Sequence, residues 1–159
     1  GLADKAIQEA KERIRAAVES SGFWPPHHKP IRILVSLGPA DLKKEGSLYD
    51  LPIALGYLAA SKQTDFDPSG RIFVGELALD GKLRRARGAL SFAILAKEKG
   101  IKELILPREN IAEARLVLHD QAIGMNDLEE TIEYLEGKKK ILWENPAETA
   151  GKRAINPSS

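Results

Sequence analysis

Four basic side chains stand close together in the segment KLRRARG, and this residue type binds phosphate groups. They are Lys82, Arg84, Arg85 and Arg87. Side chains alternate between the two faces of an extended strand, so Lys82 and Arg84 would share one face while Arg85 and Arg87 would share the other. At most half of the cluster can then serve one surface. Two interpretations stay open: a nucleic-acid contact, or an edge strand kept soluble by its charge.

Other polar residues give weaker indications of chemistry. Glu76 lies in an expected strand and could be a general base, although a lone carboxylate is more typical of a salt bridge or a cap. His27 and His28 are adjacent in a proline-rich loop without a nearby carboxylate, and His119 stands apart from both, so we expect no metal site. The sequence contains no Walker GxxxxGK[ST] motif and no GxGxxG after a strand, which argues against nucleotide binding by those routes.

A glycine-containing loop at residues 38–46 precedes an almost wholly apolar helix, which we expect to be central and buried. Asp50 is the predicted N-cap, and Pro52 falls in the first turn, where a missing N–H costs little. A helix start of this kind can bind an anion or activate a side chain. The alternative is that Gly46 and Asp50 only shape and cap a core helix.

The composition indicates a single globular domain. The chain has 159 residues, 43% of them hydrophobic, and its 24 basic and 23 acidic residues leave a net charge of +1. Any binding to nucleic acid must therefore be local. There is no cysteine and no apolar run near the roughly 20 residues of a transmembrane helix, so we expect a cytoplasmic protein with no membrane partner. The start at Gly1 suggests a processed or excised chain.

Hydrophobic periodicity and turn residues predict an α+β fold with a mixed sheet. The expected elements are a helix at 4–21, a strand at 31–37, the central helix from Asp50, a strand at 71–79, a hairpin turn at Asp80-Gly81 leading into 82–85, a helix at 89–99, a strand at 102–106, a helix at 109–118, a strand at 119–125 and a helix capped by Asn126 or Asp127 and ending at 136. Residues 1–137 form the expected domain. Residues 138–159 read as a tail or linker.

Two segments, GPADLKKEGSLYDLPIALGYLAAS and GELALDGKLRRARGALSFAILAKEKGIKELILPREN, resemble the N-terminal domain of the magnesium-chelatase-related AAA+ ATPases of the YifB or ComM family. The residues that carry the resemblance are Ala40-Asp41-Leu42, Lys44-Glu45-Gly46, Asp50-Leu51-Pro52-Ile53-Ala54-Leu55-Gly56, Gly75-Glu76-Leu77, Gly81, Arg87-Gly88, Pro107, Glu109 and Asn110. The likeness covers residues 1–137. It implies a few strands upstream of Gly1 and an ATPase module after the tail, which would bind ATP and Mg²⁺.

A more distant resemblance is to the proteolytic domain of Lon proteases, which implies a ribosomal protein S5 domain 2-like fold with helices mainly on one face of the sheet. The serine and lysine of the Lon dyad align with Leu48 and Leu90, which have no nucleophilic or basic atom. Ser47 and Ser91 are each one residue away, a rotation of about 100° on a helix. A revived site would need Ser47 and a rearranged Lys43 or Lys44.

These resemblances imply a non-catalytic accessory domain that assembles the oligomer of an ATPase or presents its substrate. The parent would be a DNA branch-migration motor, its partners being its own AAA+ module, neighbouring subunits of a hexamer, and DNA. The chain itself would hold no cofactor. Two alternatives remain: a Lon-like serine peptidase, disfavoured by Leu48 and Leu90, and an autonomous nucleic-acid-binding module that uses the basic cluster.

Overall fold

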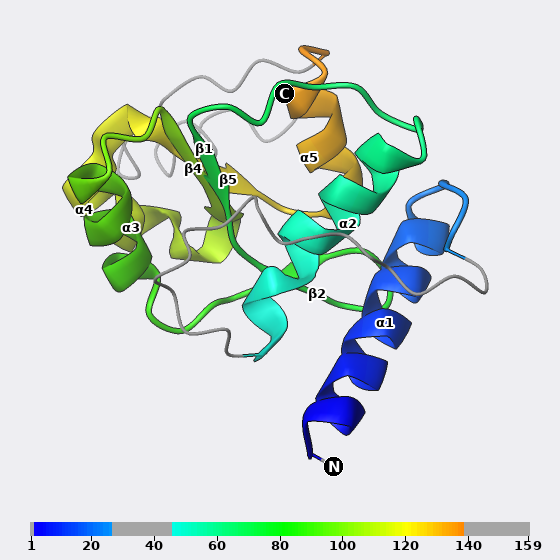
Figure 1. The fold of residues 1–159 in the computed structure, drawn as a ribbon. Helices are drawn as coiled ribbons and strands as arrows, with labels where there is room; N and C mark the ends of the chain where they lie inside the picture. The colour runs from blue at the N-terminus through cyan, green and yellow to red at the C-terminus, as the bar shows by residue number, and fades with distance from the viewer. Residues whose placement is uncertain (1, 27–45, 139–159) are drawn as a thin grey trace, which may run out of the picture.

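The computed structural model describes residues 2–26 and 46–138 of the chain (Figure 1). The predicted strand at 31–37, most of the loop at 38–46 and the predicted tail after 138 lie outside these residues.

A three-stranded parallel sheet stands at the centre of the described fold, with the order β1-β4-β5. Its strands are β1 (Arg71–Phe73), β4 (Glu103–Pro107) and β5 (Ala122–Met125). Ile72 lies opposite Leu104, and Ile105 lies opposite Ile123. Aliphatic runs of this kind are typical of strands that are buried on both faces. The sheet therefore needs a layer of helices on each side.

Helices supply both layers, which lie on the two sides of the sheet in Figure 1. One layer consists of α3 (Ala89–Glu98) and α4 (Ile111–Leu118), whose buried residues form one core with Leu104 and Leu106 of β4. The other consists of α1 (Leu2–Ser20), α2 (Asp50–Ala60) and α5 (Leu128–Leu135), which share a second core with Ile105. The expectation that helices lie mainly on one face is wrong, because alternate side chains of β4 need cover on opposite faces.

The predicted hairpin is present as β2 (Glu76–Leu77) and β3 (Leu83–Arg84), an antiparallel pair separate from the parallel sheet. Its loop is longer than the predicted two-residue turn. The Ala78 N–H donates to the Lys82 carbonyl at 2.8 Å, the Gly81 N–H donates to the Ala78 carbonyl at 2.9 Å, and Gly81 has a φ of +92°. A left-handed glycine at this position is typical of a three-residue hairpin loop with a bulge.

The predicted strand at 71–79 is broken at Val74 and Gly75. The Val74 N–H still donates to the Ile105 carbonyl of β4 at 3.0 Å, but the Gly75 N–H donates to the Leu48 carbonyl at 2.9 Å. The chain thus leaves the parallel sheet for a contact beside α2 before the hairpin begins. The described strands form a parallel sheet and a separate hairpin, where the sequence predicts one mixed sheet, and both are compatible with the α+β class.

Most predicted helices are confirmed within a few residues of their expected ends. At α5, the Asp127 carboxylate caps the helix by accepting the Glu130 N–H at 2.7 Å. Two boundaries differ, because the 3₁₀ turn η2 (Arg108–Asn110) precedes α4 and the 3₁₀ turn η3 (His119–Gln121) replaces the start of the predicted strand at 119–125.

The prediction that Asp50 is the N-cap of α2 is wrong. The 3₁₀ turn η1 (Gly46–Tyr49) leads directly into α2, so Asp50 is already helical. Its carboxylate, only 1% exposed, instead accepts the Arg13 Nε–H at 2.8 Å, the Arg13 Nη2–H at 3.1 Å and the Leu77 backbone N–H at 3.1 Å. Burial raises the pKa of the Asp50 carboxyl, and the bonds from Arg13 and Leu77 oppose that rise. One carboxylate therefore joins α1, α2 and β2.

We predict that Arg13→Ala destabilises the protein by about 3 kcal/mol, because removing one partner of a buried ion pair leaves the other charge uncompensated. Arg15→Ala is the matched control on the same helix: Arg15 pairs with Glu12 and Glu19 at the surface, where such pairs contribute less than about 1 kcal/mol. Urea unfolding measures both changes. Equal small losses would show that the Asp50 contact does not hold the helices together.

Candidate functional site

The structure separates the four basic residues that the sequence groups together. All four are exposed. Arg84 lies opposite Glu76 in the hairpin, with its Nε 3.6 Å from the Glu76 Oε1. Arg85 and Arg87 line one hollow of about 370 Å³, as the predicted alternation places them, whereas Lys82 lines a different one. The pair Arg85 and Arg87 is therefore the part of the cluster that shares a surface.

Asn110 fixes the backbone between these two arginines. Its side chain is fully buried and forms two bonds with Ala86: the Ala86 N–H donates to Oδ1 at 2.8 Å, and Nδ2 donates to the Ala86 carbonyl at 2.9 Å. A third bond runs from Nδ2 to the Glu113 carboxylate at 2.8 Å. We call the two bonds to Ala86 the Asn110 clasp. The clasp holds Ala86 toward the interior. The two residues next to Ala86, Arg85 and Arg87, therefore extend outward from a backbone that is held in place.

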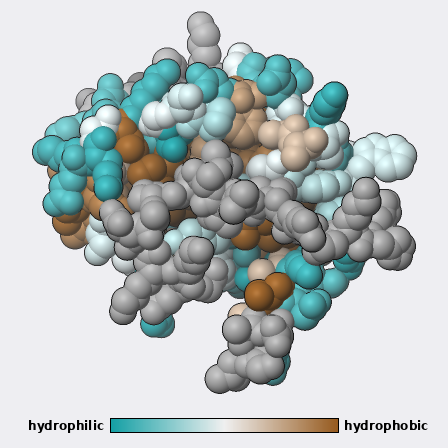
Figure 2. All heavy atoms as spheres, viewed as in Figure 1, coloured by the Kyte–Doolittle hydropathy of each residue, from teal (hydrophilic) through white to brown (hydrophobic). Residues whose placement is uncertain are grey.

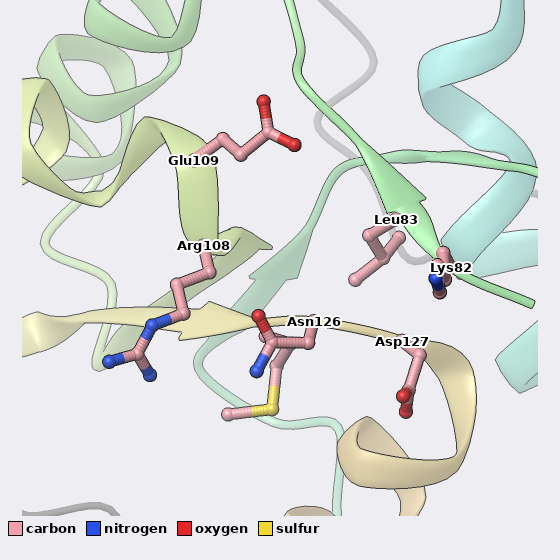
Figure 3. A pocket seen from close by; sticks show the side chains of 7 residues that line it. Lys82, Leu83, Arg108, Glu109, Asn126 and Asp127 are labelled. Atoms are coloured by element: carbon pink, nitrogen blue, oxygen red, sulfur yellow. The ribbon is translucent and has the colours of Figure 1, made fainter. Parts of the chain in front are cut away.

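A second hollow, of about 280 Å³, opens at the carboxyl ends of two parallel strands (Figure 3). We call it the carboxyl-edge pocket. Its lining residues are Lys82, Leu83, Arg108, Glu109, Met125, Asn126 and Asp127. This edge is where parallel α/β sheets most often bind ligands. The hairpin forms one wall, since the Leu83 N–H donates to the Asn126 carbonyl at 2.9 Å.

Close packing of β5 against η2 shapes the opposite wall of this pocket. A Cβ added at Gly124 would lie 3.1 Å from the Arg108 Cα and 3.3 Å from the Ile111 Cβ. Any larger residue at position 124 would therefore push η2 away from the sheet. Glycine at this position lets η2, with Arg108 and Asn110, lie directly against the edge of the sheet.

Three arginines that have no partner among the described residues belong to the two segments joined by the Asn110 clasp. All the other arginines in the described ranges have ion pairs or other interactions, and these are Arg13, Arg15, Arg71, Arg84 and Arg115. By contrast, Arg85, Arg87 and Arg108 have no side-chain hydrogen bond or ion pair with any described residue. Arg85 and Arg87 flank Ala86, and Arg108 shares η2 with Asn110. An unpaired guanidinium is free to bind an anion.

Arg108 is the residue that sequence reasoning missed. It lies some twenty residues from the basic cluster, and only the folded chain brings the two together. Its position in the sequence could have indicated a functional residue. Arg108 immediately follows Pro107 at the end of a predicted strand and precedes Glu109 and Asn110, two of the residues that carry the family resemblance. The carboxyl end of a strand is a position where functional side chains often stand.

The two positions that correspond to a Lon dyad lie on different elements. Leu48 is half-buried in η1, and Leu90 is exposed on α3. The Ser47 hydroxyl donates to the Glu76 carboxylate, which also faces Arg84, so Glu76 forms the salt bridge that the sequence suggested. Lys43 and Lys44 lie outside the described residues.

The start of α2 is packed against the chain between β1 and β2. The Leu51 N–H donates to the Gly75 carbonyl at 3.0 Å, so this helix start is engaged within the fold.

His119 is exposed in η3, while His27 and His28 lie outside the described residues. Within residues 2–26 and 46–138, no three histidine or acidic side chains are grouped as a metal site, and no helix is long and apolar enough to cross a membrane.

The surface over α3 and α4 carries hydrophobic residues among hydrophilic ones (Figure 2). The large apolar side chains exposed on these two helices are Leu90, Ile94 and Leu116. Single exposed apolar residues are common on soluble proteins and need no ligand to explain them.

Comparison with known proteins finds one family and several relatives. Residues 1–110 match the family described as subunit ChlI of Mg-chelatase. The competence protein ComM of Haemophilus influenzae is 39% identical over 98% of this chain and 31% of its own length. The uncharacterized protein YifB of Salmonella typhimurium is 42% identical over 89% of this chain and 27% of its own length, and YifB of Escherichia coli is 37% identical over 96% and 29%. The chain thus spans about three tenths of the length of these relatives.

We predict that Asn110→Ala destabilises the protein by about 2–3 kcal/mol, because the buried N–H and carbonyl of Ala86 lose their partners. Backbone amides of residues 85–88 should also exchange with solvent faster. Gln121→Ala is the control, since the Gln121 amide donates to the Ile101 carbonyl at an exposed site and should cost less than about 1 kcal/mol. Urea unfolding and hydrogen exchange measure these effects. Unchanged exchange at 85–88 would contradict the clasp.

Proposed function

The chain belongs to the family described as subunit ChlI of Mg-chelatase and is related to ComM and YifB, and from this we propose that it is a non-catalytic accessory domain of a magnesium-chelatase-like AAA+ ATPase. In this proposal the domain presents nucleic acid to the ATPase module. ATP and Mg²⁺ bind on that module, neighbouring subunits assemble into a ring in the cytoplasm, and the parent acts as a DNA branch-migration motor. The ring rests on analogy with other AAA+ proteins.

The observation that supports the nucleic-acid role is that the arginines next to the Asn110 clasp have no partner among the residues that the structure describes. Guanidinium groups bind phosphate oxygens through two parallel hydrogen bonds, which makes arginine well suited to a phosphate backbone. The clasp fixes the loop before any ligand arrives, so binding does not have to order the backbone. Arg85 and Arg87 are the proposed contacts. Arg84 contributes less in this proposal, because Glu76 already faces it.

The non-catalytic role is supported by the side chains at the dyad positions. Leu48 and Leu90 offer neither a nucleophile nor a base. The hydroxyl of the neighbouring Ser47 donates a hydrogen bond to the Glu76 carboxylate, and Ser91 is exposed on α3. We therefore do not propose a peptidase.

We predict that the chain binds branched and single-stranded DNA saturably at low salt, and that Arg85→Ala/Arg87→Ala weakens binding about tenfold or more. The logarithm of the binding constant should fall linearly with the logarithm of the salt concentration, and the variant should lower that slope by about 1–2, since each phosphate contact contributes about 0.7–0.9. Fluorescence anisotropy with labelled DNA at low and at physiological salt measures both quantities.

The control is Lys5→Ala/Lys97→Ala, which removes the same charge from exposed positions on α1 and α3. At physiological salt it should leave the affinity within about threefold of the unaltered chain, because the Debye length is then about 8 Å and exposed charges farther than this from the ligand are screened. Equal losses in both variants would indicate a non-specific charge effect. An absence of binding even at low salt would reject the nucleic-acid role.

A further inference from the structure

We propose that the carboxyl-edge pocket is a second nucleic-acid subsite, where Lys82 and Arg108 bind a phosphodiester segment next to the one held by Arg85 and Arg87. This inference rests on the proposed function and deepens it. It adds Arg108, which lies outside the basic cluster of the sequence, and it assigns Lys82 to a different subsite from Arg85 and Arg87.

The Asn110 clasp joins the two chain segments that contribute to the two hollows. Arg85 and Arg87 precede and follow Ala86 in the chain, and Ala86 is one partner in the clasp. Arg108 belongs to the same three-residue turn as Asn110, the other partner. In our proposal one continuous strand of nucleic acid contacts both hollows.

The shape of the pocket fits an extended anion. Lys82 and Arg108 come from opposite walls, the hairpin and η2, with Leu83 and Asn126 between them (Figure 3). Both basic side chains are without a partner among the described residues. A volume of about 280 Å³ lies just below the range of sites that enclose drug-sized ligands. A sugar-phosphate segment that lies across the pocket meets a cation at each end.

Acidic residues around the two hollows are mostly engaged. Asp127 accepts the Glu130 N–H as the cap of α5, and Glu113 accepts the Asn110 amide. Glu109 is different, because its carboxylate has no partner within the described residues. It points away from the Arg108 guanidinium, toward the space between η2 and β3 (Figure 3). The Glu109 carboxylate therefore repels a bound phosphate. The proposal then predicts that removing this charge strengthens binding, whereas removing Lys82 and Arg108 weakens it.

The test compares three variants with the unaltered chain in binding to a labelled DNA duplex across a range of salt concentrations. Lys82→Ala/Arg108→Ala should weaken binding about tenfold at low salt and lower the salt slope by about 1–2. Glu109→Gln should strengthen binding about twofold to threefold. Arg85→Ala/Arg87→Ala reports on the first subsite. All of these residues are exposed, and urea unfolding checks that the variants remain folded.

A spectroscopic readout locates the ligand directly. Addition of the duplex should shift the NMR signals of the Asn126 side-chain amide and the Gly124 backbone amide, and Lys82→Ala/Arg108→Ala should abolish these shifts while the signals of residues 85–88 still respond.

The outcomes separate the two proposals. If Arg85→Ala/Arg87→Ala weakens binding while Lys82→Ala/Arg108→Ala binds like the unaltered chain, the second subsite is wrong and the proposed function stands. Unchanged or weaker binding by Glu109→Gln also counts against the subsite. If the unaltered chain binds no duplex, branched or single-stranded DNA at low salt, both proposals fall.

Discussion

The buried carboxylate of Asp50 is the interaction on which the arrangement of the other elements depends. A charge that is 1% exposed is tolerated only with a counter-charge and hydrogen bonds, which Arg13 and the Leu77 N–H provide. These partners come from α1 and β2, so satisfying one side chain fixes a surface helix and a hairpin against α2. The hairpin then forms a wall of the carboxyl-edge pocket, since Leu83 bonds to Asn126. The position of the site thus depends on a contact within the core.

The segment from Arg84 to Ala89, which carries Arg85 and Arg87, is held by contacts at three places. At one end Arg84 of β3 pairs with Glu76 of β2, and at the other end Ala89 is fully buried at the start of α3. The Asn110 clasp holds the middle. Each restraint comes from a different part of the chain, so no single element presents the arginines. A loop fixed in this way loses little conformational entropy when it binds a ligand.

Local signals predicted the helices, the Asp127 cap and the hairpin, while long-range packing decided the remaining features. A two-residue turn at Asp80-Gly81 would place Glu76 opposite Arg85. The extra loop residue shifts the register by one and places Glu76 opposite Arg84 instead. A one-residue slip exchanges the faces of a strand, so it also determines which arginine is neutralised. The sequence pattern cannot resolve that slip, nor could it show that Arg108 and Lys82 line one pocket, because both depend on tertiary contacts.

A chain with a net charge of +1 can still present a local positive site, because its ion pairs are unevenly distributed. Arginines on α1 and in the sheet are paired with carboxylates, while those at the clasp have no carboxylate partner in the described part of the chain. A few phosphate contacts give a weak and strongly salt-dependent interaction. Several copies of such a site bind more tightly together than one copy alone. When the copies are linked in one assembly, binding of the first raises the effective concentration for the rest. The nucleic-acid site that we propose would therefore suit an accessory domain of a larger assembly better than an independent nucleic-acid-binding protein.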